Sequence, residues 1–296
     1  MTSWPELRIE AWRDTYATLL LEAQIVGKIR LALTKRMNEW WNVPLYVTAR
    51  GLTTSPMPYG ESTFSIDLDL VEHRAVVQAF DGQVRSVPLS ARPVADFHAA
   101  LFRELKALGI EVDIDPRPQE CPVTTPLHEI TEHKSYDPAQ ARAFFEALRR
   151  IEPVFQSFRA GFRGKCSPVH FFWGAFDLAV TRFSGRPAPA RKGLVERVAY
   201  DEEVASLGFW PGDPWTGQTE PAFYAYTVPE PAGLAQHRAE PEGAFWTDAL
   251  KEHLLPYDVV RRSSDPAGSI LTFAQSCYDA GARLAGWDTA ALAYRG

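Results

Sequence analysis

The 296-residue chain has few cysteines and no long uninterrupted apolar run, and each shortage excludes a class of protein. Its three cysteines, Cys121, Cys166 and Cys277, are widely separated and lack the spacing of a zinc finger or a redox motif. They predict reduced thiols in a reducing compartment. No segment approaches the roughly 18 apolar residues of a membrane-spanning helix, and no signal peptide is recognisable at the start. We therefore expect a cytoplasmic protein with no membrane partner.

Basic residues are also in short supply. The formal net charge is −6, whereas nucleic-acid binding needs a basic face, so nucleic acid is not an expected partner. One stretch is locally basic, and its pattern favours a solvated basic loop over an anion site. Its cations are Arg182, Arg186, Arg191, Lys192 and Arg197.

Several motifs of common enzymes are missing. The chain has no glycine-rich phosphate loop, no flavin motif, no Gly-x-Ser-x-Gly elbow and no Cys–His nucleophile context. Nucleotide-dependent chemistry and the common hydrolase folds are therefore disfavoured.

The chain does contain the hydrophobic periodicity of both helices and strands. Apolar residues at helical spacing predict helices over about 10–33 and 93–108, and from Asp137 and Asp265 onward. Strict alternation predicts strands, most clearly over 62–70. Further strands are expected at 45–49, 75–80, 84–89 and 223–228. Asp81-Gly82 predicts a two-residue hairpin turn.

Residues 169–183 leave two alternatives open. They are compatible with two short strands around Gly174 or with one buried helix, and their many aromatic residues favour strands.

These elements predict an α+β fold with an antiparallel sheet and flanking helices, in one compact domain over 1–296. The order helix, strands, helix occurs twice, which is compatible with two pseudo-repeated halves, 1–136 and 137–296, sharing one core. A proline-rich connection over 115–136 separates the halves, and long ordered connections are disproportionately functional.

Charged residues occur inside the aromatic segment 167–186. If it is buried, His170, Asp177 and Arg182 need partners, because an isolated buried charge is costly. One interpretation is a pocket in which Asp177 orients His170, or pairs with Arg182, beside aromatic walls. The other is a core ion pair with a core histidine. In a strand, Asp177 and Arg182 would face opposite sides, whereas in a helix His170 and Asp177 would share a face.

A second candidate lies in the long connection. His128 and His133 are five residues apart, one too many for the metalloprotease motif. Glu129 and His133 are four apart and could supply two metal ligands or an acid–base pair. Solvated charges at a helix start are the alternative. Two ligands do not make a divalent-metal site, so Asp177, Glu203 or His170 would have to complete it. The candidate ligands are Glu129, His133 and His170.

Aromatic residues are frequent near predicted turns, which raises the expectation of a ligand pocket. An arginine, Arg182 or Arg50, could hold an anionic group. The candidate ligand-binding residues are Arg50, Tyr59, Trp173, Arg182, Trp210, Tyr224 and Tyr226.

Four segments resemble a bacterial family of unknown function, DUF5996. They are Trp40–Leu52, Ser167–Arg186, Gly208–Gly212 and Phe223–Tyr226, and the resemblance extends over nearly the whole chain. It implies a one-domain bacterial protein and no particular activity. Where members of the family tend to carry His-Glu, this chain has Glu202-Glu203.

Two main functions follow from these residues. The first is a small-molecule enzyme with an aromatic-lined pocket, in which His170, Asp177, Glu203 and His133 converge for acid–base or metal chemistry. The second is a non-catalytic protein that binds a small ligand. A third, a partner-binding scaffold, would need an exposed apolar patch.

Overall fold

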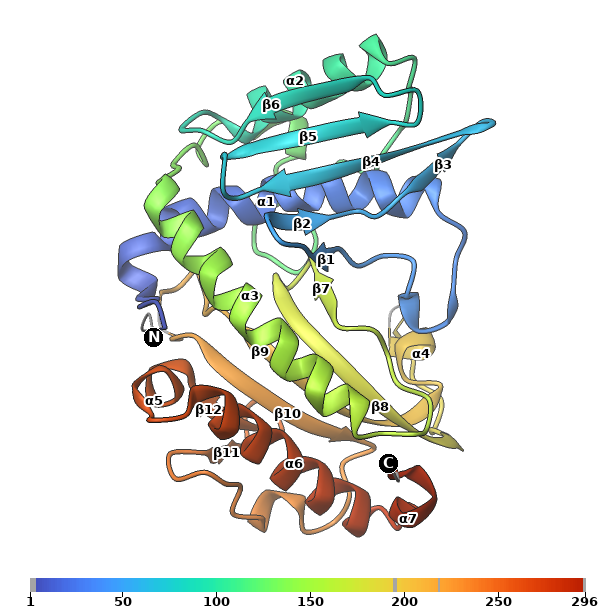
Figure 1. Cartoon of the computed structure of the whole chain (residues 1–296), viewed down its shortest axis with the longest axis vertical. Helices are drawn as coiled ribbons and strands as arrows, with labels where there is room; N and C mark the ends of the chain where they lie inside the picture. Colours follow the sequence, from blue (N-terminus) through green and yellow to red (C-terminus); the bar gives the residue numbers. More distant parts are fainter. Residues whose placement is uncertain (1–3, 194–195, 218, 295–296) are drawn as a thin grey trace.

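The chain folds into two antiparallel sheets of six strands, each flanked by helices (Figure 1). This computed structural model describes residues 4–193, 196–217 and 219–294. The predicted α+β class is confirmed, as is the order helix, strands, helix in each half of the chain.

The first half contains ten elements. They are α1 (Ile9–Leu33), η1 (Asn38–Trp40), β1 (Tyr46–Val47), β2 (Gly51–Thr53), β3 (Met57–Tyr59), β4 (Ser62–Asp69), β5 (Arg74–Ala79), β6 (Val84–Pro88), α2 (Val94–Ala107) and η2 (Leu127–Glu129).

The second half contains twelve described elements. They are α3 (Pro138–Ala160), β7 (His170–Phe172), β8 (Asp177–Pro187), α4 (Glu196–Ala199), β9 (Glu202–Trp210), β10 (Ala222–Val228), η3 (Leu234–Gln236), β11 (Phe245–Thr247), β12 (Glu252–Pro256), α5 (Tyr257–Arg262), α6 (Pro266–Leu284) and α7 (Thr289–Leu292).

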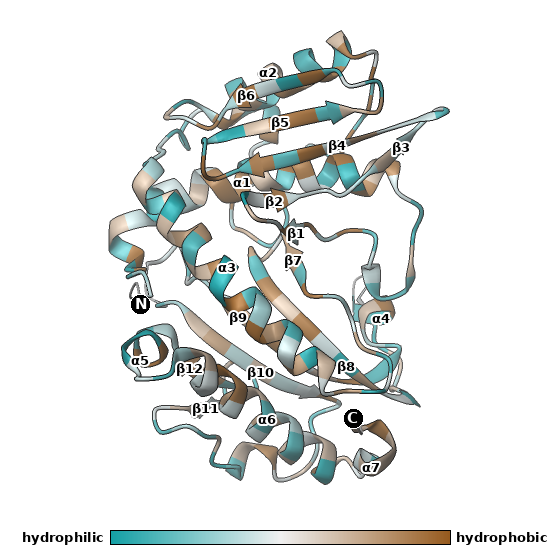
Figure 2. Cartoon of the chain, in the orientation of Figure 1, coloured by the Kyte–Doolittle hydropathy of each residue, from teal (hydrophilic) through white to brown (hydrophobic). Residues whose placement is uncertain are grey.

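The first sheet has the strand order β1-β2-β4-β5-β6, with β3 also paired to β4. The alternation of β4 buries Phe64, Ile66 and Leu68. Helices α1 and α2 lie against one face of this sheet (Figure 2). The turn between β5 and β6 is longer than predicted, because the Ala79 N–H donates to the Gln83 carbonyl across a three-residue loop. A three-residue hairpin loop needs a left-handed last residue, and Gly82 supplies it with φ 86°.

The second sheet has the strand order β11-β12-β10-β9-β8-β7. It resolves the alternative over 169–183 in favour of strands, with Gly174 in the turn between β7 and β8. Helices α3 and α6 cover one face of this sheet (Figure 1). The other face is therefore available to form a site.

The two sheets meet where β1 approaches β7. Leu45 and Phe171 exchange two backbone hydrogen bonds of 2.9 Å across this junction. The buried apolar side chains of both halves form one contiguous cluster. The site-bearing sheet thus shares its core with the first sheet.

Asp137 begins α3 as the sequence predicts, since its side chain accepts hydrogen bonds from the N–H groups of Ala139 and Gln140. In a capping box, the side chain of the third helical residue would in return accept a hydrogen bond from the Asp137 N–H, but here a tertiary contact takes its place. The Asp137 N–H donates to Thr15 Oγ1 on α1 at 2.9 Å, which ties the two helices together instead.

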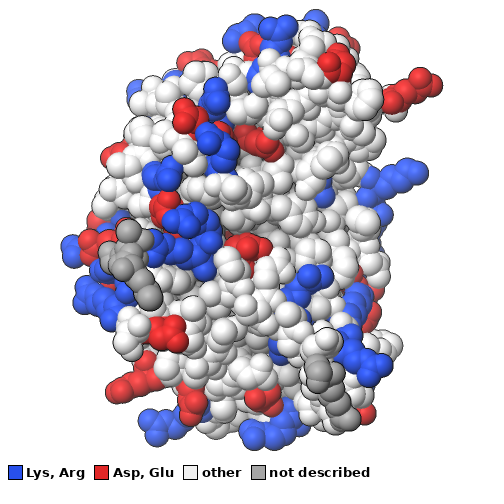
Figure 3. All heavy atoms as spheres, viewed as in Figure 1, with Lys and Arg blue, Asp and Glu red and all other residues white. Residues whose placement is uncertain are grey.

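None of the helices in the described ranges has both the length and the apolar character needed to cross a membrane. On the face drawn in Figure 3, Lys and Arg lie among Asp and Glu, and a largely uncharged area occupies the centre. This face therefore carries no extended patch of one sign.

Candidate functional site

A cavity of about 530 Å³ opens on the face of the second sheet that α3 and α6 leave uncovered. Strand alternation builds its floor. On β8, Asp177, Thr181 and Phe183 line the cavity, whereas Leu178 and Arg182 are buried on the opposite side. The neighbouring strands β7, β9, β10 and β12 add the residues that point to the same face of the sheet as Asp177 and Thr181. The predicted residues His170, Trp210, Tyr224 and Tyr226 are among them.

Asp177 is the central charged group of the floor. Only 7% of it is exposed, and its Oδ2 accepts a hydrogen bond from the Tyr224 hydroxyl. Burial raises the pKa of Asp177 to about 7, and the nearby charge of Glu120 acts in the same direction. Gly208 leaves room for the Tyr224 ring to reach Asp177, because a Cβ at this position would overlap that ring.

Three tyrosines form a row beside Asp177. The rings of Tyr224 and Tyr226 lie parallel with centroids 6.0 Å apart, and the hydroxyls of Tyr226 and Tyr200 are 3.1 Å apart. Burial raises the pKa of each of these three phenols. They therefore stay protonated near neutral pH and can donate hydrogen bonds.

Two further carboxylates line the cavity. Burial raises the pKa of Glu252, on β12, to about 7, and the charge of Asp177 adds to this effect. Burial also raises the pKa of Glu120, which comes from the long connection. Gly174 leaves room for Glu120, since a Cβ there would lie 2.5 Å from its Oε1 atom.

The long connection is fixed in place by a buried amide on α1. The Gln24 Nε2 group donates to the Gln119 carbonyl at 2.7 Å, and the Gln24 Oε1 atom accepts from the Gln119 N–H at 2.8 Å. This pair of bonds places the next residue, Glu120, over the cavity. The connection 115–136 thus contributes one residue to the cavity lining, Glu120, which the sequence pattern does not single out.

His170, on the neighbouring strand β7, lies among three aromatic rings. Trp41, Tyr46 and Phe172 have ring centroids 6.0, 5.6 and 5.4 Å from that of His170. The residue is 1% exposed, and its Nε2 atom has no hydrogen-bond partner in the described structure. Burial lowers the pKa of His170 to about 3, so the imidazole is neutral.

The expected pairing of Asp177 with His170 or Arg182 is not formed. The hydrogen-bond partner of Asp177 is Tyr224, although His170 lines the same cavity. Arg182 faces the opposite side of the sheet, as the strand alternative predicts. Its guanidinium lies 3.5 Å from the Phe158 ring centroid and 4.4 Å from that of Tyr278, so it is a core residue and not part of a solvated basic loop.

A charged network closes the edge of the cavity near η1. Lys165 Nζ lies 2.5 Å from Glu39 Oε1 and 2.6 Å from Glu202 Oε1, and 4.5 Å from the Phe183 ring centroid. Glu39, Asp201 and Glu202 are the one group of three metal-binding side chains that comes together within the described ranges. The Lys165 ammonium already satisfies two of these carboxylates.

The three predicted metal ligands do not belong to that group. Glu129 lies 3.4 Å from His128, and the His133 ring contacts Trp215 at a centroid distance of 5.5 Å. Neither Glu129 nor His133 lines the cavity with His170. Sequence proximity in the connection therefore does not assemble the metal site that the pattern suggested.

Glu203 also lies apart from Asp177. It follows Glu202 on β9 and so points to the other face of the sheet. Its Oε2 atom is 2.6 Å from Arg186 Nη2 and accepts a 2.8 Å hydrogen bond from the Trp287 indole. Glu203 therefore links β9 to the region that follows α6. Of the four expected catalytic residues, His170 and Asp177 line the cavity, and Glu203 and His133 do not.

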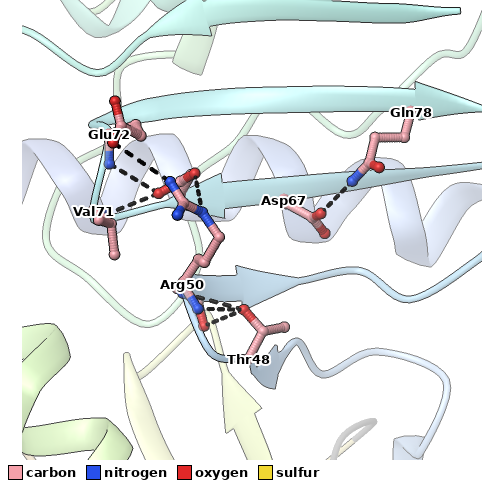
Figure 4. A network of polar contacts seen from close by, with 8 residues as sticks. Thr48, Arg50, Asp67, Val71, Glu72 and Gln78 are labelled. Atoms are coloured by element: carbon pink, nitrogen blue, oxygen red, sulfur yellow. Dashed lines mark hydrogen bonds and ion pairs between the residues drawn. The ribbon is translucent and has the colours of Figure 1, made fainter.

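Two predicted ligand-binding residues lie on the first sheet. Arg50 Nε donates to Asp69 Oδ2 at 2.8 Å, while Asp69 Oδ1 accepts from the backbone of Glu72 (Figure 4). The Tyr59 hydroxyl accepts a 2.8 Å hydrogen bond from the Glu111 N–H. Both residues stabilise loops, and neither lines the cavity.

Trp173 is a packing residue at the junction of the sheets. Its indole N–H donates to the Val43 carbonyl at 2.9 Å, and its ring fills the space above Gly27 on α1. It is absent from the cavity lining.

The fold and site together define an α+β protein with a cavity on one face of an antiparallel sheet, lined by aromatic and acidic residues. The chain matches the Family of unknown function (DUF5996) over residues 4–294, and it belongs to that family. Neither a curated protein nor a solved structure matches it.

Proposed function

We propose that the chain is an enzyme that binds a small molecule over the second sheet and uses Asp177 to transfer a proton. The observation that carries this proposal is the environment of Asp177. Burial brings its pKa to about 7, so the protonated and ionised forms are both populated near neutral pH. A general acid–base group works best when its pKa lies near the working pH.

Tyr224 supports the same role. Its hydroxyl donates to Asp177 Oδ2, which leaves Oδ1 to take a proton from a bound molecule. The second half of the reaction returns this proton to a different atom of the bound molecule or exchanges it with water. The Tyr224 hydrogen bond stabilises the ionised form in between.

The cavity suits a small ligand. Its volume of about 530 Å³ falls within the range of roughly 300–1,000 Å³ that is usual for such sites. Its walls include Trp41, Phe172 and Trp210, whose rings offer apolar contact area.

Exchange of hydrogen for deuterium tests proton transfer while the substrate is still unidentified. The purified protein is incubated in D₂O with a bacterial metabolite extract, and mass spectrometry then follows which metabolites gain deuterium at carbon. We expect at least one labelled metabolite with the wild type and none with Asp177→Asn. Glu203→Gln, on the opposite face of the same sheet, should label as the wild type does. Labelling that persists in Asp177→Asn would overturn the proposal.

A second candidate is non-catalytic ligand binding, which the hydroxyl groups of the cavity favour. Ser167 Oγ donates to the Pro168 carbonyl, and Thr181 Oγ1 lies 3.0 Å from Ser206 Oγ. These hydroxyls are satisfied within the protein and none is activated by His170. Ligand-induced stabilisation without any labelling in D₂O would identify this function.

A bacterial cytoplasmic location is part of the same proposal. It is supported by the three cysteines, which are all free. Subcellular fractionation of a source organism tests it, with recovery in the cytoplasmic fraction as the expected result.

A further inference from the structure

The charge of the cavity lining is one-sided. Within the described residues, the side chains that line the cavity include four carboxylates and neither lysine nor arginine. The four are Glu39, Glu120, Asp177 and Glu252.

Only one of these carboxylates has a cationic partner. Glu39 pairs with Lys165 at the edge of the cavity, and Asp177 accepts its hydrogen bond from a neutral phenol. The side chains of Glu120 and Glu252 form no hydrogen bond or ion pair with any other residue in the described ranges. Buried or half-buried carboxylates without a partner are costly, and a cation between them would lower that cost.

His170 provides an independent observation. It is 1% exposed, lines the cavity and has an unpartnered Nε2 atom. A buried ring nitrogen without a partner points to a group that the protein itself does not supply. A ligand carrying N–H donors would satisfy a neutral imidazole nitrogen of this kind.

The aromatic walls accept cations as well. Lys165 Nζ lies 4.5 Å from the Phe183 ring centroid, and the Arg191 guanidinium lies 4.7 Å from that of Tyr200. Both rings line the cavity, whereas both cations belong to its surroundings. Trp41 and Trp210 offer further ring faces of the type that attracts ammonium groups.

We propose that the cavity binds a small organic ammonium ion, with the charged nitrogen between Glu120, Asp177 and Glu252 and the carbon skeleton against the aromatic walls. This names the substrate class of the proposed enzyme and rests on that function.

A metal ion is the other cation to consider. These three carboxylates do not bring ligand atoms within 4.8 Å of one another, whereas Glu39, Asp201 and Glu202 do. A compact divalent ion would need these oxygens close together, whereas an alkylammonium ion can be stabilised by carboxylates that it does not all touch.

Matched ligands of equal shape and different charge test the proposal. The probes are tryptamine, tryptophol and indole-3-acetate, and the corresponding phenethylamine, 2-phenylethanol and phenylacetate. Isothermal titration calorimetry measures their affinities for the wild type, Glu120→Gln, Glu252→Gln and Glu203→Gln. The last variant removes a carboxylate from the opposite face of the sheet. Circular dichroism establishes that each variant is folded.

We expect at least one amine to bind about tenfold or more tightly than its alcohol and its carboxylate. This preference should fall to about twofold or less in Glu252→Gln or Glu120→Gln and persist in Glu203→Gln. The ammonium assignment is overturned if no amine binds, if alcohols or carboxylates bind as tightly, or if the preference survives both cavity substitutions.

The two proposals fail separately. Amine binding without Asp177-dependent deuterium labelling would keep the ligand class and remove the proton transfer. Asp177-dependent labelling of a neutral or anionic metabolite, with no amine preference, would keep the proton transfer and remove the ligand class.

Discussion

The Tyr224 hydroxyl donates its hydrogen bond to Asp177 Oδ2 across the floor of the cavity. The two residues come from β10 and β8, which flank β9, so the contact spans a whole strand. It can form because the intervening residue of β9 is Gly208, over which the Tyr224 ring lies. The hydrogen bond partly offsets the effect of burial, which raises the pKa of Asp177, and it shapes the floor of the cavity.

The stability of the protein should reveal the raised pKa of Asp177. Its folded value is about 7 and its unfolded value is 3.8. Between these values the folded state holds a proton that the unfolded state has lost, so wild-type stability falls as pH rises from about 4 to 7. Asp177→Asn removes this titration and keeps an oxygen that can accept from Tyr224. We expect the variant to gain roughly 2–3 kcal/mol relative to the wild type between pH 4.5 and 7.5.

Urea unfolding of both proteins across this pH range measures the difference. Glu252 titrates in the same window, but the larger part of its pKa shift comes from burial, is present in both proteins and cancels. A difference between wild type and variant that does not change with pH would show that Asp177 ionises normally.

The space above Gly208 should be essential for the site. In Gly208→Ala the new Cβ would overlap the Tyr224 ring, which must then move away from Asp177. We expect a loss of roughly 1–3 kcal/mol in stability, as for other overpacked positions, and loss of ligand binding. Gly161→Ala is the matched control, because its Cβ would meet atoms no closer than 3.6 Å. Equal effects of the two substitutions on ligand binding would argue against the role of Gly208.

Local pattern predicts much of this fold because short-range physics decides it. The alternation over 62–70 reflects burial of one face, and Asp137-Pro138 begins a helix through its own side chain and ring. Segment 169–183 is ambiguous in sequence because a strand buried on both faces loses its alternation. Here one face meets helices, and the other meets aromatic residues of the cavity.

The site is predictable only in part, for a related reason. His170 and Asp177 lie in one conspicuous aromatic segment, and both line the cavity. Glu203 does not line the cavity, because the residues of β9 that face it are Ser206 and Trp210, and Glu203 points to the opposite side of the strand. Glu120 and Glu252 reach the cavity through tertiary packing, which leaves little trace in a single sequence. The one signal for Glu120 is its place in a long connection.

The ion pair between Arg50 and Asp69 should affect stability and leave ligand binding unchanged. Burial opposes ionisation of Asp69, but the Glu72 N–H and Arg50 outweigh it and lower the pKa of Asp69 below 3.8. Its contribution to stability is therefore present above about pH 4 and lost as pH falls through the folded pKa. Because the Arg50 side chain is half exposed, Arg50→Gln should lower the stability only slightly at pH 7 and still less at pH 3.

Thermal unfolding at the two pH values measures this effect. Arg85→Gln is a control on β6, since Arg85 is exposed and forms no ion pair in the described part of the chain. An Arg50→Gln variant that lost amine binding would return Arg50 to the ligand site.

The amide of Gln24 should hold the long connection, and with it Glu120, against the body of the protein. Gln24 is fully buried on α1, and Gln24→Ala leaves both the N–H and the carbonyl of Gln119 without their partner. Two lost hydrogen bonds at a buried site should cost about 2–4 kcal/mol. The released connection should be cut faster by a glutamate-specific protease at Glu120, and amine affinity should fall because Glu120 is no longer held at the cavity. Gln78→Ala provides the matched control, since the exposed Gln78 donates a 2.6 Å hydrogen bond to Asp67 on the surface of the first sheet (Figure 4). It should change neither proteolysis nor affinity. Rapid cleavage of Gln24→Ala with unchanged amine affinity would mean that Glu120 does not contribute to the site.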